Sequence, residues 1–83
     1  MIKYLVDIHI PAAGRHLDAF LPANKQIGEV IVLLKEASEP LVGGSYRGTA
    51  DAMLLNADTG LPYGQTLTVE EAGIRNASRL ILI

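Results

Sequence analysis

The strongest constraint on the fold is the alternation of apolar and polar residues over the first ten positions. A period of two places the apolar side chains on one face of a β-strand that is buried on that side only. Residues 15–21 repeat the pattern, and the proline- and glycine-containing segment 11–14 is typical of a turn. The chain is therefore predicted to begin with a β-hairpin. The apolar face of its first strand consists of Ile2, Tyr4, Val6, Ile8 and Ile10.

The phases of the two alternations set the register of this hairpin. A turn centred on residues 12–13 pairs residues whose numbers sum to 25, so Ile8 lies opposite Leu17. The other face then carries two polar pairs, His9 opposite His16 and Asp7 opposite Asp18. Zinc accepts imidazoles and carboxylates as ligands, but diagonal histidine–aspartate contacts on an exposed face are the more common arrangement. We therefore expect a solvated polar face and no metal site.

After Pro22 the apolar period changes to about 3.6 residues, which predicts the one helix of the chain. Asn24 is the expected N-cap, and Pro40 ends the helix because proline disfavours a helical conformation of the residue before it. Glycine permits close approach of a neighbouring element, so we expect Gly28 to lie near the sheet. The apolar stripe of this helix comprises Ile27, Val30, Ile31 and Leu34.

The second half of the chain contains only short segments. Thr68 and Glu71 have the spacing of a capping box, which predicts a single helical turn that stops at Gly73. One helix and several strands, without repeats, predict a single α+β domain over residues 1–83. The other predicted elements are a short strand at 51–56, a turn at 57–60, a very short strand at Leu61 and Tyr63, and an apolar final strand at 80–83.

The composition lacks what several classes of function need. With no cysteine among 83 residues, disulfide scaffolds, thiolate metal sites and cysteine nucleophiles are excluded. The net charge is −2 with interspersed signs, which is unlike a nucleic-acid-binding surface. No apolar run approaches the roughly 18 residues of a membrane span, and Asp7 interrupts the segment where an export signal would be apolar. We expect a cytoplasmic protein without a nucleic-acid partner or direct membrane insertion.

No constellation of catalytic residues is visible. The three serines have no spacing that argues for a Ser-His-Asp arrangement. The glycines of residues 43–49 are spaced like those of a phosphate-binding loop, but the lysine of that motif is absent, so this segment is expected to form a flexible connection. We expect neither enzymatic activity nor a cofactor.

The order of features in the last third resembles the C-terminal half of ubiquitin. In the ubiquitin family an isoleucine six residues before the first core leucine of the final strand fills the core, and Ile74 and Leu80 keep this spacing. With the preceding hairpin and helix, the resemblance covers essentially the whole chain. It implies a β-grasp fold, a mixed sheet of four to five strands packed on one helix. The features that carry it are Met53-Leu54-Leu55, Gly60-Leu61, Thr66-Leu67, Glu71–Ile74 and Arg79–Ile83.

Two further segments bring the resemblance closest to the small YukD/EsaB proteins of bacterial type VII secretion systems. These are Leu21-Pro22-Ala23, at the exit of a strand into the helix, and the ending that runs from Gly73-Ile74 to Leu80. Ubiquitin-like modifiers and sulfur carriers end in Gly-Gly, whereas this sequence ends at Leu82-Ile83. The resemblance thus implies a non-conjugating adaptor that binds protein partners, either membrane-bound secretion components or a second copy of itself, at the cytoplasmic periphery of the membrane.

The surplus of apolar residues indicates where such a partner binds. If Leu80 and Leu82 face the helix, as the resemblance implies, Ile81 and Ile83 point to the opposite, open face of the sheet. The β-grasp order makes the first and last strands neighbours, so we expect Leu5, Ile81 and Ile83 to form a contiguous patch. The complete set of predicted partner-binding residues is Leu5, Phe20, Leu55, Ile81 and Ile83.

Two other functions stay open on the sequence. One is a regulatory subunit of a multicomponent enzyme, because β-grasp proteins also occur in that role. The other is a ubiquitin-like modifier or sulfur carrier that has lost its Gly-Gly tail.

Overall fold

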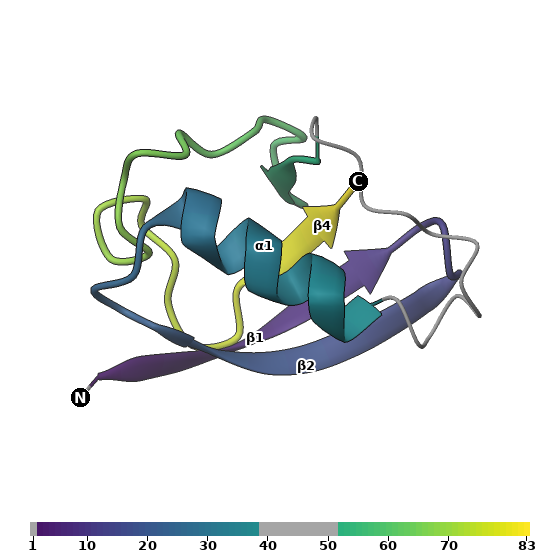
Figure 1. Ribbon diagram of the computed structural model, residues 1–83, viewed down its shortest axis with the longest axis horizontal. Coiled ribbons are helices and arrows are strands. Elements are labelled where there is room, and N and C mark those ends of the chain that lie inside the picture. The colour runs from purple at the N-terminus through teal and green to yellow at the C-terminus, as the bar shows by residue number, and fades with distance from the viewer. Residues whose placement is uncertain (1, 39–51) are drawn as a thin grey trace.

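The computed structural model describes residues 2–38 and 52–83 and contains four strands and one helix in the described ranges. The sheet order is β2-β1-β4-β3, with β1 and β4 parallel and the other two pairs antiparallel (Figure 1). This mixed sheet packed on one helix confirms the predicted fold class. Expectations about Pro40 and residues 40–51 lie outside the described residues. The elements are β1 (Lys3–Ile10), β2 (Arg15–Pro22), α1 (Ile27–Ser38), β3 (Leu54–Asn56) and β4 (Arg79–Leu82).

The β1–β2 hairpin has the predicted register. Ile8 pairs with Leu17, and every paired position in the hairpin obeys the same sum of 25. The turn is closed by the Gly14 N–H, which donates to the Pro11 carbonyl at 3.1 Å. Gly14 has a φ of +60°, a conformation that only glycine adopts readily, so this residue sets where the second strand begins.

The core lies between α1 and one face of the sheet, on which the helix is seen in Figure 1. Leu80 and Leu82 are buried there, as the ubiquitin resemblance implied, and Ile74 is fully buried beside them in the same cluster. Among the described residues, no helix has both the length and the apolarity that crossing a bilayer requires. The core side chains are Val6, Ile8, Ile10, Leu21, Ile27, Val30, Ile31, Leu34, Ala52, Leu54, Val69, Ile74, Leu80 and Leu82.

The helix begins differently from the prediction. Its first residue is Ile27, which makes Gln26 the N-cap position, so Asn24 lies two positions too early. Backbone carbonyls of a distant loop satisfy the first N–H groups instead: Ile27 donates to Leu67 at 2.8 Å and Gly28 to Gln65 at 3.0 Å. The element that approaches Gly28 closely is therefore this loop, where the prediction had expected the sheet.

Two of the predicted strands are shorter than expected. In the described part of the segment predicted at 51–56, the strand covers only 54–56, and Leu61 and Tyr63 flank an isolated bridge between Leu55 and Pro62. Proline has no N–H to donate to a ladder, which limits the pairing at this position. The Tyr63 N–H still donates to the Leu54 carbonyl at 3.0 Å, so the loop stays attached to the edge of the sheet.

A reciprocal capping box holds the turn that precedes β4. The Thr68 N–H donates to Glu71 Oε1 at 2.9 Å, and the Glu71 N–H donates to Thr68 Oγ1 at 3.1 Å. The predicted single turn is present and ends at Gly73, whose φ is +84°. This turn places the Ile74 side chain in the core, so the capping box helps to position a core residue.

Stability at acid pH is expected to depend on this box. The Thr68 N–H and then its side chain lower the pKa of the Glu71 carboxyl from its ordinary 4.5. A pKa lowered by folding gives stability that is complete above the unfolded value and is lost as pH falls through the folded value. Glu71→Gln should therefore flatten the fall in urea midpoint below about pH 4.5. If the urea midpoints of the wild type and the variant fell equally with pH, this expectation would be contradicted.

Candidate interaction surface

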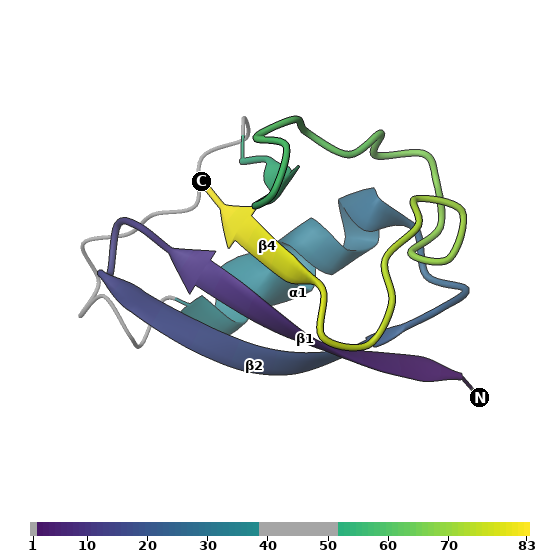
Figure 2. The same ribbon diagram turned by 180° about the vertical axis from the view of Figure 1, so that it is seen from behind.

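The sheet face opposite α1 carries the residues predicted to bind a partner. Figure 2 shows β1, β2 and β4 in front of the helix, and no described helix covers this side. Alternation along the strands points every second side chain outward, so the face contains both apolar and polar groups. These side chains are Lys3, Leu5, Asp7 and His9 on β1, His16, Asp18, Phe20 and Pro22 on β2, Arg79 and Ile81 on β4, Leu55 on β3, and Ile83 and Met53 beyond the strand ends.

The strand registers divide the five predicted residues into two groups. Leu5 pairs with Phe20 across the β1–β2 ladder, whereas Ile81 pairs with His9 on β1 and with Leu55 on β3. The Asp7–Arg79 pair lies between them, and Leu5 and His9 are four residues apart on β1, about 13 Å along a strand. The expectation that Leu5 is contiguous with Ile81 and Ile83 is therefore wrong.

The cause is the offset between β1 and β4. These strands are parallel, and Asp7 lies beside the first residue of β4, so β4 starts level with the middle of β1. We name the two groups by their residues: the N-terminal pair is Leu5 and Phe20, and the C-terminal cluster is Met53, Leu55, Ile81 and Ile83. Exposure is 42% for Leu5, 66% for Phe20 and 45% for Ile83, so both groups offer apolar surface to a partner.

Polar side chains separate the two groups. The rings of His9 and His16 stack with centroids 4.5 Å apart, and His16 Nδ1 lies 3.0 Å from Asp7 Oδ1. This is the diagonal histidine–aspartate contact expected from the hairpin register. Within residues 2–38 and 52–83, no three histidine, aspartate or glutamate side chains form a group suited to a metal ion.

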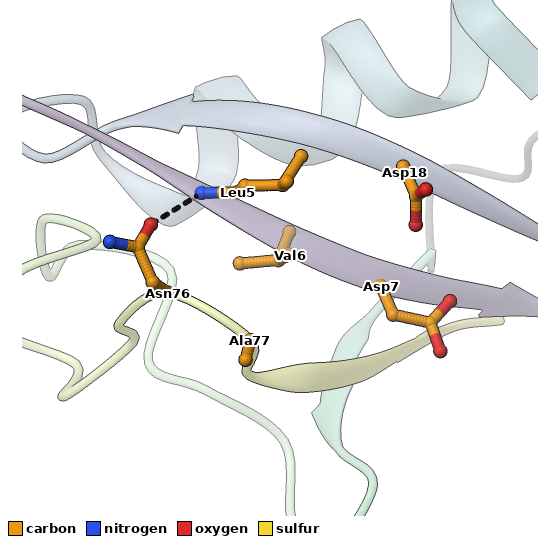
Figure 3. Close-up of a pocket in the computed structure, with 6 residues that line it drawn as sticks. All are labelled: Leu5, Val6, Asp7, Asp18, Asn76 and Ala77. Carbon is orange, nitrogen blue, oxygen red and sulfur yellow. Dashed lines mark hydrogen bonds between the residues drawn. The ribbon is translucent and has the colours of Figure 1, made fainter.

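A groove of about 480 Å³ opens beside the N-terminal pair (Figure 3). Leu5, Val6 and Ala77 lie in its middle, and Asp7 and Asp18 lie at one end. Asn76 is at the other end, where its Oδ1 accepts the Leu5 N–H at 2.9 Å. The groove thus joins an apolar floor to a pair of carboxylates.

Sequence reasoning missed a second exposed apolar area, on the outer side of α1. Val32 and Leu33 are 53% and 50% exposed, and with Lys25 and Glu29 they line a shallow hollow. The signal was present in the run of five apolar residues 30–34. Five consecutive positions cover the whole circumference of a helix at 3.6 residues per turn, so such a run cannot be buried on one side only.

Ubiquitin and ubiquitin-like domains are among the solved structures that resemble this chain, whereas no family model and no curated protein matches it. The ubiquitin-like domain of the type VII secretion protein EccD1 from Mycobacterium tuberculosis is 23% identical, with a TM-score of 0.68 over 100% of this chain and 99% of that one. Caldiarchaeum subterraneum ubiquitin is 18% identical, with a TM-score of 0.74 over 99% and 92%. These similarities show that the chain has the ubiquitin-like fold.

A third similar structure belongs to a large assembly. A chain of the MycP5-free ESX-5 inner membrane complex is 17% identical to this protein, with a TM-score of 0.71. The match covers 98% of this chain and 20% of that one, so it concerns one domain of the larger polypeptide.

Proposed function

We propose that this protein is a ubiquitin-like accessory component of a bacterial type VII secretion system, similar to the YukD/EsaB proteins. It works as a non-conjugating adaptor without catalysis of its own, on the cytoplasmic side of the membrane. The partner is a protein of the membrane-bound secretion machinery. The similarity to the EccD1 domain and to a chain of the ESX-5 inner membrane complex supports this assignment.

The open face of the sheet is the observation that carries the adaptor role. It presents two apolar groups on a rigid β-sheet, and α1 occupies only the other side (Figure 2). Apolar groups framed by polar side chains are typical of a protein-binding surface. A specific complex buries roughly 800 Å² on each partner, so a stable contact would extend over both groups.

The direct test is recovery of the partner from detergent-solubilised membranes of the source cells with tagged protein. We expect the wild type to retain components of a type VII inner-membrane complex. Ile81→Ser with Ile83→Ser should reduce this recovery at least tenfold, because the C-terminal cluster loses its apolar contact area. Leu5→Ser with Phe20→Ser tests the N-terminal pair separately, and circular dichroism confirms that each variant is folded.

Val32→Ser with Leu33→Ser is the matched control, since these residues have similar exposure on the opposite side of the domain. Recovery lost in this control and kept in both sheet variants would contradict the open face as the binding surface. Recovery of oxygenase subunits would instead indicate a regulatory subunit of an enzyme. Intact-mass adducts or lysine-linked conjugates would indicate a modifier.

A further inference from the structure

The groove beside Leu5 combines apolar surface with negative charge, whereas the N-terminal pair and the C-terminal cluster are apolar only. Its floor is apolar, formed by Leu5 and the methyl group of Ala77, and it leads to the carboxylates of Asp7 and Asp18 (Figure 3). The Asn76 side chain is held by its hydrogen bond from the Leu5 N–H, and the Ala77 N–H donates to the Leu5 carbonyl at 2.8 Å. The walls of the groove are therefore fixed before any partner arrives.

The two carboxylates form an unfavourable pair in the free protein. Asp7 and Asp18 lie directly opposite each other across the β1–β2 ladder. Like charges at this position destabilise a sheet, because Cα atoms of such partners are only about 4.5 to 5.5 Å apart. A cation placed between the two carboxylates would remove this repulsion.

The positive groups nearby leave the pair only partly neutralised. His16 contacts Asp7 at 3.0 Å, but it is charged only when protonated. Arg79, the neighbour of Asp7 on β4, is directed to Asp58, with 2.6 Å between Nη2 and Oδ1. Asp18 is exposed and, among the residues that the structure describes, has no cation within ion-pair distance. The negative end of the groove is thus available to a ligand.

We propose that this groove binds an arginine side chain of the partner protein. Its aliphatic stem lies over Leu5 and Ala77, and its guanidinium group donates hydrogen bonds to the carboxylates of Asp7 and Asp18. An apolar residue next to this arginine packs on Phe20. The inference rests on the proposed function, because it specifies the chemistry of a partner at the open face.

The same charges argue against a second copy of this chain as the occupant. Two copies stacked through their open faces would bring one acidic pair close to the other, which costs energy on burial. A partner with an exposed basic residue is instead attracted to the acidic pair. Arginine fits better than lysine because its planar fork can contact two adjacent carboxylates at once.

The test is an NMR titration of the full chain with the capped dipeptide acetyl-Leu-Arg-amide at low salt. We expect saturable shifts of the amide signals of Leu5, Asp18 and Ala77. Asp18→Asn should raise the dissociation constant about fivefold, which is the loss of affinity expected for one exposed ion pair. Glu36→Gln, which removes an exposed carboxylate on α1, should leave it unchanged.

Acetyl-Leu-citrulline-amide has nearly the same shape without the charge and should give no saturable shift. Binding of citrulline equal to that of arginine, equal weakening by Glu36→Gln and Asp18→Asn, or shifts that depend on protein concentration without peptide would each overturn the proposal. The dipeptide assay needs no secretion component. Its result therefore stands whether or not the membrane experiment recovers a type VII partner.

Discussion

Replacing Ile74 with alanine is expected to lower the free energy of unfolding by about 2 to 5 kcal/mol. The side chain is 0% exposed and belongs to the core cluster, so its removal leaves a cavity. Its backbone position is fixed by the Gly73 turn before it and by the hydrogen bond from its N–H to the Val69 carbonyl at 3.3 Å. The surrounding chain therefore has little freedom to fill the space.

This loss is large for so small a domain, whose total stability is of the order of 4 to 12 kcal/mol. Urea unfolding followed by circular dichroism measures it, and Ile74→Val, expected to cost about 0.5 to 1.5 kcal/mol, keeps the test possible if the alanine variant does not fold. Ile83→Ala is the control because that side chain is 45% exposed. Similar losses for Ile74→Ala and Ile83→Ala would contradict the assignment of Ile74 to the core.

The register of the hairpin could be predicted to the residue because the information that sets it is local. Two strands of period two, joined by a turn with Gly14 at positive φ, admit few registers that keep both apolar faces on the same side. The start of α1 could not be predicted in this way. Its N–H groups bond to Gln65 and Leu67, almost 40 residues further along the chain, and no pattern around Asn24 reports on that contact.

In the candidate site, too, local features could be predicted from the sequence and features that depend on distant contacts could not. Alternation correctly placed the side chains of Leu5, Phe20 and Ile81 on the outer face of the sheet. Whether outward residues on different strands touch depends on the offset between β1 and β4, which is set by the loop before β4. In that loop Ala77 adopts a φ of +70° and binds to the Leu5 carbonyl, so tertiary contacts determine the offset. A face that alternation predicts as one patch is therefore two patches, and the groove with the acidic pair opens beside the first of them.

Gly28→Val is expected to destabilise the protein by about 1 to 3 kcal/mol, although helix propensity alone predicts a small gain. A Cβ atom on Gly28 would lie 3.3 Å from the Gln65 carbonyl oxygen, and that oxygen cannot easily move. It accepts the Gly28 N–H at 3.0 Å, while the neighbouring Leu67 carbonyl accepts the Ile27 N–H at 2.8 Å. The larger side chain must break these two bonds or displace the loop, and either change exposes unsatisfied N–H groups at the helix start.

Whether Gly28→Val raises or lowers the unfolding midpoint shows which effect is larger, the gain in helix propensity or the clash with the 65–67 loop. Glu36→Val, at an exposed position of the same helix, measures the intrinsic effect of valine in α1 without a neighbouring loop. We expect thermal unfolding to show a lower midpoint for Gly28→Val than for Glu36→Val, together with faster amide exchange at Ile27. A midpoint for Gly28→Val at or above that of the wild type would mean that the 65–67 loop yields easily. The carbonyl groups of Gln65 and Leu67 would then contribute little to the stability of the helix.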